Sequence, residues 1–170
     1  MRKHGFTLLE LLVAMAIGAI LLALAAPGMA HQRAAAAVRT ASSQALAALQ
    51  LGRRIALARG QNVTVCPSPD GVTCGWGGRQ WLLFANSPGG TDRRRDATDD
   101  LLRQWELPAG VFVTGTRGYA DFQPRPEAAT TVTFRFCHPG APNAGIAIVI
   151  SQTGRPRVVR RVSAAACGTR

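Results

Sequence analysis

Glu10 is the only charged side chain in an apolar run of 21 residues from Phe6 to Ala26. The run is long enough to cross a bilayer as a helix, and a carboxylate near its start is costly there without a charged partner. Cleavage after Gly5 would supply that partner, because Phe6 would then carry an ammonium group. Glu10 can neutralise this charge on its own chain or on a neighbouring subunit. The pattern therefore predicts proteolytic processing followed by charge-paired assembly.

An ordinary secretory signal peptide is the simpler interpretation of the same segment. Arg2 and Lys3 would form its basic region, and Gly28-Met29-Ala30 would be its small-residue cleavage site. The apolar run is longer than the roughly 7–15 residues usual for such a signal, and it contains an acid. Both features argue against this interpretation.

The N-terminal segment instead resembles the class III signal of type IV pilins and pseudopilins. In that family a prepilin peptidase cleaves after a glycine and methylates the new N-terminal residue. The resemblance places the cut after Gly5, makes Phe6 the methylated residue, and makes Glu10 the fifth residue of the mature chain. Pro27 falls where such proteins often bend their long helix.

A second candidate site is a group of arginines near the C-terminus, in Gly154-Arg155-Pro156-Arg157. Gly154 and Pro156 mark a tight connection between two predicted strands of an antiparallel hairpin. Guanidinium groups held at one rigid turn can bind phosphate as a multidentate clamp. The simpler alternative is an exposed hairpin tip with solvated arginines.

The alternation of side chains along an extended strand orders the arginines that follow this turn. It predicts Arg155, Arg157 and Arg161 on one face together with Val159, whereas Arg160 points the other way. We therefore expect Arg155, Arg157 and Arg161 to form the anion-binding site.

The charge balance agrees with an acidic partner. The chain has a net charge of +11, and removal of residues 1–5 would leave 18 arginines, no lysine and 9 acids. Six arginines follow Glu127 and no acid does. An excess of this kind favours nucleic acid or anionic lipid as a partner.

Four cysteines are present, and none stands at a spacing typical of zinc ligands. An even number beyond an export signal favours disulfides in an oxidising compartment. We expect Cys66 to pair with Cys74, around the turn dipeptide Asp70-Gly71, and Cys137 to pair with Cys167.

Nothing in the sequence indicates catalysis. It contains no Gly-x-Ser-x-Gly elbow, no Walker A loop and no His-Glu-x-x-His motif, and Lys3 is its only lysine. His31 and His138 stand alone. We therefore expect no catalytic residue, metal site or cofactor.

The elements that position these sites follow from periodicity. Residues 30–59 are rich in alanine and continue the N-terminal helix, with Leu46, Leu49, Ala56 and Leu57 near one face and Gly60 as its stop. Arg53, Arg54 and Arg59 are expected on a solvated, cationic helix end. Short strands follow, over residues 63–66, 80–85, 101–106, 111–115, 131–137, 146–150 and 158–162.

Over nearly its whole length the chain also resembles the FimT branch of the FimT/GspH family. The resemblance rests on the Gly-Arg-x-Arg pattern with a last cysteine beyond it, and on Val63-Thr64-Val65-Cys66-Pro67 with Cys74 downstream. It implies an α+β, type IV pilin-like fold with a long N-terminal helix and a small C-terminal antiparallel β-sheet domain. The expected parts are a leader at residues 1–5, a helix over residues 6–60 with a transmembrane segment at 6–26, and a β-rich domain over residues 61–170.

The same resemblance implies a function. FimT-type minor pilins are implied to bind DNA through the motif arginines during natural transformation. The expected partners are double-stranded DNA of any sequence, other pilin subunits, prepilin peptidase and the inner membrane, with the domain in the periplasm or on an extracellular pilus. The alternative is a GspH-like minor pseudopilin of a type II secretion system, in which the basic tip contacts neighbouring subunits or cargo.

Overall fold

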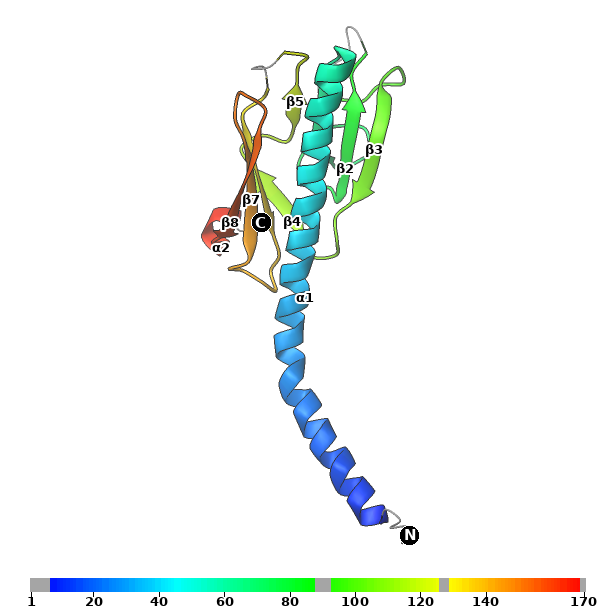
Figure 1. The fold of residues 1–170 in the computed structure, drawn as a ribbon, viewed down its shortest axis with the longest axis vertical. Coiled ribbons are helices and arrows are strands. Elements are labelled where there is room, and N and C mark those ends of the chain that lie inside the picture. Colours follow the sequence, from blue (N-terminus) through cyan, green and yellow to red (C-terminus); the bar gives the residue numbers. More distant parts are fainter. Residues whose placement is uncertain (1–6, 88–92, 126–128, 169–170) are drawn as a thin grey trace, which may run out of the picture.

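The computed structural model describes residues 7–87, 93–125 and 129–168 of the chain. One long helix, α1 (Leu8–Arg59), runs the length of the molecule, and a β domain packs against its C-terminal half (Figure 1). This is the α+β arrangement that the sequence predicts. The strands and the short second helix are β1 (Val63–Ser68), β2 (Gln80–Ala85), β3 (Asp100–Glu106), β4 (Phe112–Gly115), β5 (Ala120–Phe122), β6 (Val132–Cys137), β7 (Gly145–Ile150), β8 (Pro156–Val162) and α2 (Ala164–Cys167).

Helix α1 ends where the sequence predicts. Gly60 adopts the left-handed conformation, with φ of 68°, and its N–H donates to the carbonyl of Ala56 at 3.1 Å. The helix bends by 44° between Leu8–Ala23 and Gly28–Arg59. Proline removes a backbone donor from a helix interior, so Pro27 at the end of this break is a sufficient cause.

Two antiparallel sheets of four strands form the domain. Their strand orders are β3-β2-β1-β5 and β4-β6-β7-β8. Both sheets contact α1, which lies across them as in Figure 1. Strand β8 is therefore an edge strand, and one side of its backbone pairs with no strand among the described residues.

The main core lies between α1 and the two sheets. From the helix it takes small residues, including Ala41, Ala45 and Ala48, which allow close packing. Gly52 extends this close approach, because a Cβ there would lie 3.1 Å from a Val65 methyl group. Trp81 joins the two sheets: its ring lies 5.6 Å from that of Trp105 in its own sheet, and 5.2 and 5.7 Å from Phe134 and Phe136 in the other.

Leu57 and strand β5 differ from the sequence-based prediction, as do helix α2, which was not predicted, and the start of β8 at Pro156 instead of Val158. Leu57, expected on the packed face of the helix, is 46% exposed, because the core contact is made mainly by alanines at neighbouring positions. Strand β5 was not predicted. It has three residues, and its central Asp121 breaks the apolar pattern; it pairs with β1, whose Thr64 hydroxyl donates to the Asp121 carboxylate at 3.4 Å.

Both disulfides join the pairs expected from the sequence, Cys66 with Cys74 and Cys137 with Cys167. The first closes a turn organised by Asp70, whose carboxylate accepts the N–H groups of Thr73 (2.6 Å) and Val72 (2.8 Å). These bonds favour the charged carboxylate, so the pKa of Asp70 lies well below its usual range. The second ties the C-terminal helix to β6.

Reduction of the disulfides is expected to destabilise the domain strongly. Loop-closure entropy assigns roughly 2.5 kcal/mol to the shorter loop and roughly 3.5 kcal/mol to the longer one. The melting temperature should then fall by on the order of 20 °C, measured by circular dichroism with and without reductant. Paired Cys→Ser variants should show the larger loss for the 137–167 bridge. Recovery of four free thiols in non-reducing peptide maps would contradict the expected pairing.

Candidate functional site

Thr7 and Glu10 form the N-terminal cap of α1. The Thr7 hydroxyl accepts the N–H of Glu10 at 3.3 Å, and the Glu10 carboxylate accepts the N–H of Thr7 at 3.5 Å. The carboxylate is thereby turned back toward the start of the helix. The Thr-x-x-Glu spacing of a capping box is visible in the sequence and could have predicted this contact. Gly5 and Phe6, the expected cleavage residues, lie outside the described residues.

The first half of α1 carries large apolar side chains that the β domain leaves uncovered. Consecutive residues from Leu11 to Val13 are 50–60% exposed, and the large apolar side chains that follow, up to Leu22, are 55–73% exposed. A helix that is apolar all round needs an apolar environment. Within the described part of the chain, no single helix has the length and apolarity to cross a membrane, whereas Leu8–Ala23 and Gly28–Arg59 meet that test together as a bent pair.

The arginine motif lies at the tip of the β7–β8 hairpin, as predicted. Gly154 has φ of 69°, and its N–H donates to the Ser151 carbonyl at 2.8 Å, which closes the turn. The Gly154 Cα is packed so closely that an added Cβ would lie 3.2 Å from Ala129. Arg155 and Arg157 flank Pro156, and both are exposed. The tip is therefore a rigid support for two free guanidinium groups.

Two further arginines adjoin this tip. Arg53 of α1 and Arg125, in the segment after β5, line the same shallow depression as Thr153 and Gly154. If Gly154 carried a Cβ, that atom would lie 3.5 Å from the Cδ atom of Arg53. Arg53 was assigned to a solvated helix face, and Arg125 was not considered, because nothing local in the sequence shows which strand tip meets the helix end.

The prediction that Arg161 shares a face with Arg155 and Arg157 is wrong, whereas Arg160 lies away from that face as predicted. A β-bulge interrupts the pairing of β7 with β8, so that Ile146 is paired with Arg160 and Gly145 with Val162. Arg161 is the extra residue, with a left-handed φ of 62°. Arg161 consequently shares a groove with Arg160 instead of the face of Arg155 and Arg157. A non-glycine residue in this conformation costs roughly 1–2 kcal/mol.

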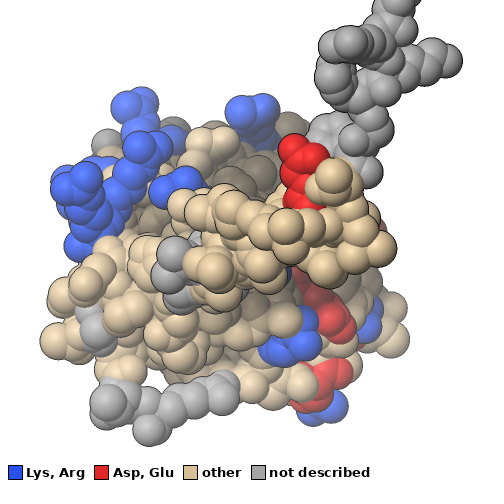
Figure 2. All heavy atoms as spheres, turned by 90° about the horizontal axis from the view of Figure 1, so that it is seen from below, with Lys and Arg blue, Asp and Glu red and all other residues tan. Residues whose placement is uncertain are grey.

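Charge is divided between the two sheets. The strands of the β4-β6-β7-β8 sheet contain four arginines and no acid. The two salt bridges among the described residues both involve the other sheet: Arg59 with Asp100 at 2.8 Å and Arg79 with Glu106 at 3.9 Å. Figure 2 shows basic groups gathered without acids on the left, the side on which β8 lies in Figure 1, and acidic groups on the right.

The three successive arginines at 93–95 lie beside the first disulfide loop. They pair with the first disulfide loop through Cys74 N–H to Arg93 O (2.8 Å) and Arg95 N–H to Val72 O (2.9 Å). The Arg93 guanidinium also lies 5.0 Å from the centre of the Tyr119 ring. This group is therefore structural in part.

Comparison with protein families gives two matches along the chain. Residues 32–154 match the family model described as type II transport protein GspH. Residues 1–26 match the prokaryotic N-terminal methylation motif. That motif and the N-terminal helix suggest a membrane-anchored pilin. No curated protein matches the chain.

Solved structures share the fold at low sequence identity. The type IV minor pilin FimU of Pseudomonas aeruginosa superposes with a TM-score of 0.56 at 19% identity, over 75% of this chain and 94% of that one. The minor pseudopilin EpsH from the type 2 secretion system of Vibrio cholerae gives a TM-score of 0.53 at 15% identity, over 72% and 96% of the two chains. The fold is thus that of minor pilins and pseudopilins.

Proposed function

Because the chain belongs to the GspH family of type II transport proteins, we propose that it is a minor type IV pilin whose β domain binds DNA. The binding site is the tip of the β7–β8 hairpin, with Arg155 and Arg157 as the central contacts. In this role the pilus captures extracellular DNA and retraction carries it toward the uptake machinery, with the work done by ATPases elsewhere in the system.

The observation that carries the proposal is the exposed arginine pair on a rigid turn. Neither Arg155 nor Arg157 forms a salt bridge with a described residue, so both retain their full capacity to bind an anion. Arg53 and Arg125 beside the tip extend the same positive surface. One guanidinium group can donate two parallel hydrogen bonds to two oxygens of the same phosphate, which favours the phosphodiester backbone as a ligand.

The mode of binding follows from the shape of the tip. Direct reading of bases requires side chains that lie inside a groove against the base edges. The proposed contacts are arginines held at a turn, which suit phosphates exposed on the outside of the duplex. Phosphate contacts carry no base information, so DNA of any sequence should bind alike.

The remaining roles concern the N-terminus. We propose that prepilin peptidase cleaves after Gly5 and methylates Phe6, and that residues 6–26 hold the chain in the inner membrane as a single span with the domain in the periplasm. Glu10 then pairs with the new ammonium group during assembly with other pilin subunits. The methylation motif and the uncovered apolar helix support this arrangement.

The test of the proposed function is DNA binding by the full chain, oxidised and held in an uncharged detergent. We expect duplexes of unrelated sequence to bind with equal affinity. The tip alone, with about four phosphate contacts, should contribute a slope of roughly −3 to −4 to the fall of log affinity against log salt. Fluorescence anisotropy over a salt series measures both quantities. Affinity that does not depend on salt, or no binding at all, would overturn the proposal.

A second function is favoured by the matched family and by the EpsH fold. The chain would then be a minor pseudopilin of a type II secretion system, with a structural role in assembly. The basic tip would contact protein instead of phosphate. Gene neighbours distinguish the two: pilus genes support the first function, and secretion genes support the second.

A further inference from the structure

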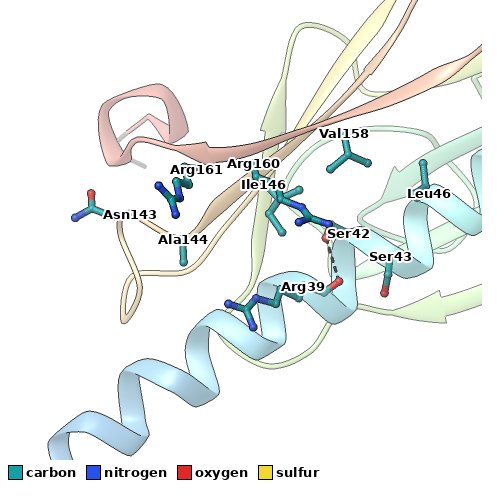
Figure 3. Close-up of a pocket in the computed structure, with 10 residues that line it drawn as sticks. All are labelled: Arg39, Ser42, Ser43, Leu46, Asn143, Ala144, Ile146, Val158, Arg160 and Arg161. Atoms are coloured by element: carbon teal, nitrogen blue, oxygen red, sulfur yellow. Dashed lines mark hydrogen bonds between the residues drawn. The ribbon is translucent and has the colours of Figure 1, made fainter.

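We propose that the groove between α1 and β8 is a second phosphate site, formed by Arg39, Arg160 and Arg161, and that DNA bound at the hairpin tip continues into it. The inference rests on the proposed function and extends it. The groove has a volume of about 720 Å³. Figure 3 shows Arg39 extending from the helix, and Arg160 and Arg161 from the strand, into the space between these two elements.

Three positive charges line this groove without an acidic partner. None of the three arginines forms a salt bridge with a residue that the structure describes, and the groove lining contains no acid. Its other polar groups are uncharged, such as Ser42 and Asn143. Like charges repel when they share one hollow, so an anion bound among them would relieve that repulsion as well as gain its own attraction.

The bulge in β8 is what creates the convergence. In regular alternation Arg160 and Arg161 would point to opposite faces of the sheet. The extra residue and its left-handed φ bring Arg161 to the helix side, where Arg160 and Arg39 already lie. Backbone strain of this kind at a concave, charged site is a recognised mark of function.

The groove and the tip are joined by an edge strand. From Arg157 to Arg160, β8 covers about 10 Å at roughly 3.3 Å per residue. Duplex DNA carries one phosphate charge per about 1.7 Å of axis, so one duplex easily reaches from the tip to the groove. A single carboxylate would accept only some of the hydrogen bonds that three guanidinium groups can donate. Successive phosphates along a DNA backbone can instead occupy both the groove and the hairpin tip.

The experiment compares DNA binding by the full chain and by Arg39→Gln/Arg160→Gln, in uncharged detergent over a salt series. Arg161 is left unchanged in this variant because glutamine would be strained in the left-handed conformation of this residue and would disturb the strand. Loss of two phosphate contacts should flatten the slope of log affinity against log salt by about 1.8 and weaken binding roughly 60-fold at about 0.1 M salt. The single variant Arg161→Asn, which tolerates a positive φ, should flatten the slope by about 0.9.

The matched control is Arg103→Gln/Arg117→Gln, which removes the same charge. Arg103 lies on β3 in the other sheet, and Arg117 follows β4, at the edge opposite β8. This control should keep the slope of the parent. Equal slopes for parent and groove variant would overturn the groove site while leaving the tip in place. A parent that binds no DNA would instead overturn the proposed function.

A lipid headgroup offers the same phosphate chemistry, and a second arm separates the two sources. Side-chain Nε–H signals of Arg39 and Arg160 are followed by NMR during addition of duplex DNA, and separately during exchange of phosphatidylcholine for phosphatidylglycerol in mixed micelles. We expect the signals to shift with DNA. Shifts with phosphatidylglycerol alone would overturn the assignment to DNA.

Discussion

Replacing both Arg155 and Arg157 by glutamine is expected to remove most DNA binding and to leave the fold intact. Both side chains are exposed and make no salt bridge with a described residue, so their loss leaves no buried charge behind. Each neutralised phosphate contributes about 0.9 to the salt dependence, so the slope should flatten by roughly two units. Anisotropy over a salt series gives the slope, and a thermal melt verifies that the domain is unchanged.

A second variant separates the charge of the two side chains from the planar shape of the guanidinium group. Arg155→Lys/Arg157→Lys keeps both charges but removes the planar fork that binds two phosphate oxygens at once. This variant should keep the parent slope and bind more weakly. If the glutamine variant binds as tightly as the parent at matched salt, the hairpin tip is not the DNA site, and the structural role in a secretion system becomes the better account.

Replacing Glu10 by alanine is expected to leave membrane insertion intact and to abolish most incorporation into filaments. The change removes the only charged group from the apolar segment, so insertion becomes easier. Assembly loses the carboxylate that neutralises the N-terminal ammonium in a low-dielectric environment. The measurement is recovery of this subunit in sheared pili, together with the intact mass of the membrane-bound chain, which should still begin at methylated Phe6.

Glu10 both caps the helix and carries a negative charge, and two further variants separate these roles. Glu10→Gln retains a side-chain oxygen for the cap and loses the charge, so it should fail in assembly like Glu10→Ala. Thr7→Val loses the cap, at a cost of about 1 kcal/mol of helix stability, and keeps the charge. It should still assemble. Normal recovery of the Glu10→Gln subunit would show that charge pairing is not what assembly requires.

The groove inference alters the ranking of arginines along β8. Strict alternation would make Arg160 the least important of the group. The bulge instead places Arg160 and Arg161 together opposite Arg39. The variants above therefore test the groove itself, because only a phosphate site in the groove predicts that loss of Arg160 weakens binding.

Several features were determined by the sequence alone. The position of Glu10 in an apolar run indicates the pilin signal, which the match to the methylation motif supports. Gly60 ends α1, and the alternation in residues 131–137 corresponds to β6. These predictions hold because they depend on local chemistry: a helix stop needs one residue free to adopt positive φ, and a half-buried strand needs a period of two.

Only the tertiary structure decided how these elements meet. Strand β5 exists because β1 offers it a partner, and its own three residues carry too little pattern to predict it. Arg53 joins the hairpin tip because the sheet packs along α1, which places residues a hundred positions apart in the sequence beside one another. The bulge at Arg161 follows from the pairing of β8 with β7. Each depends on contacts distant in sequence, and local periodicity carries no information about them.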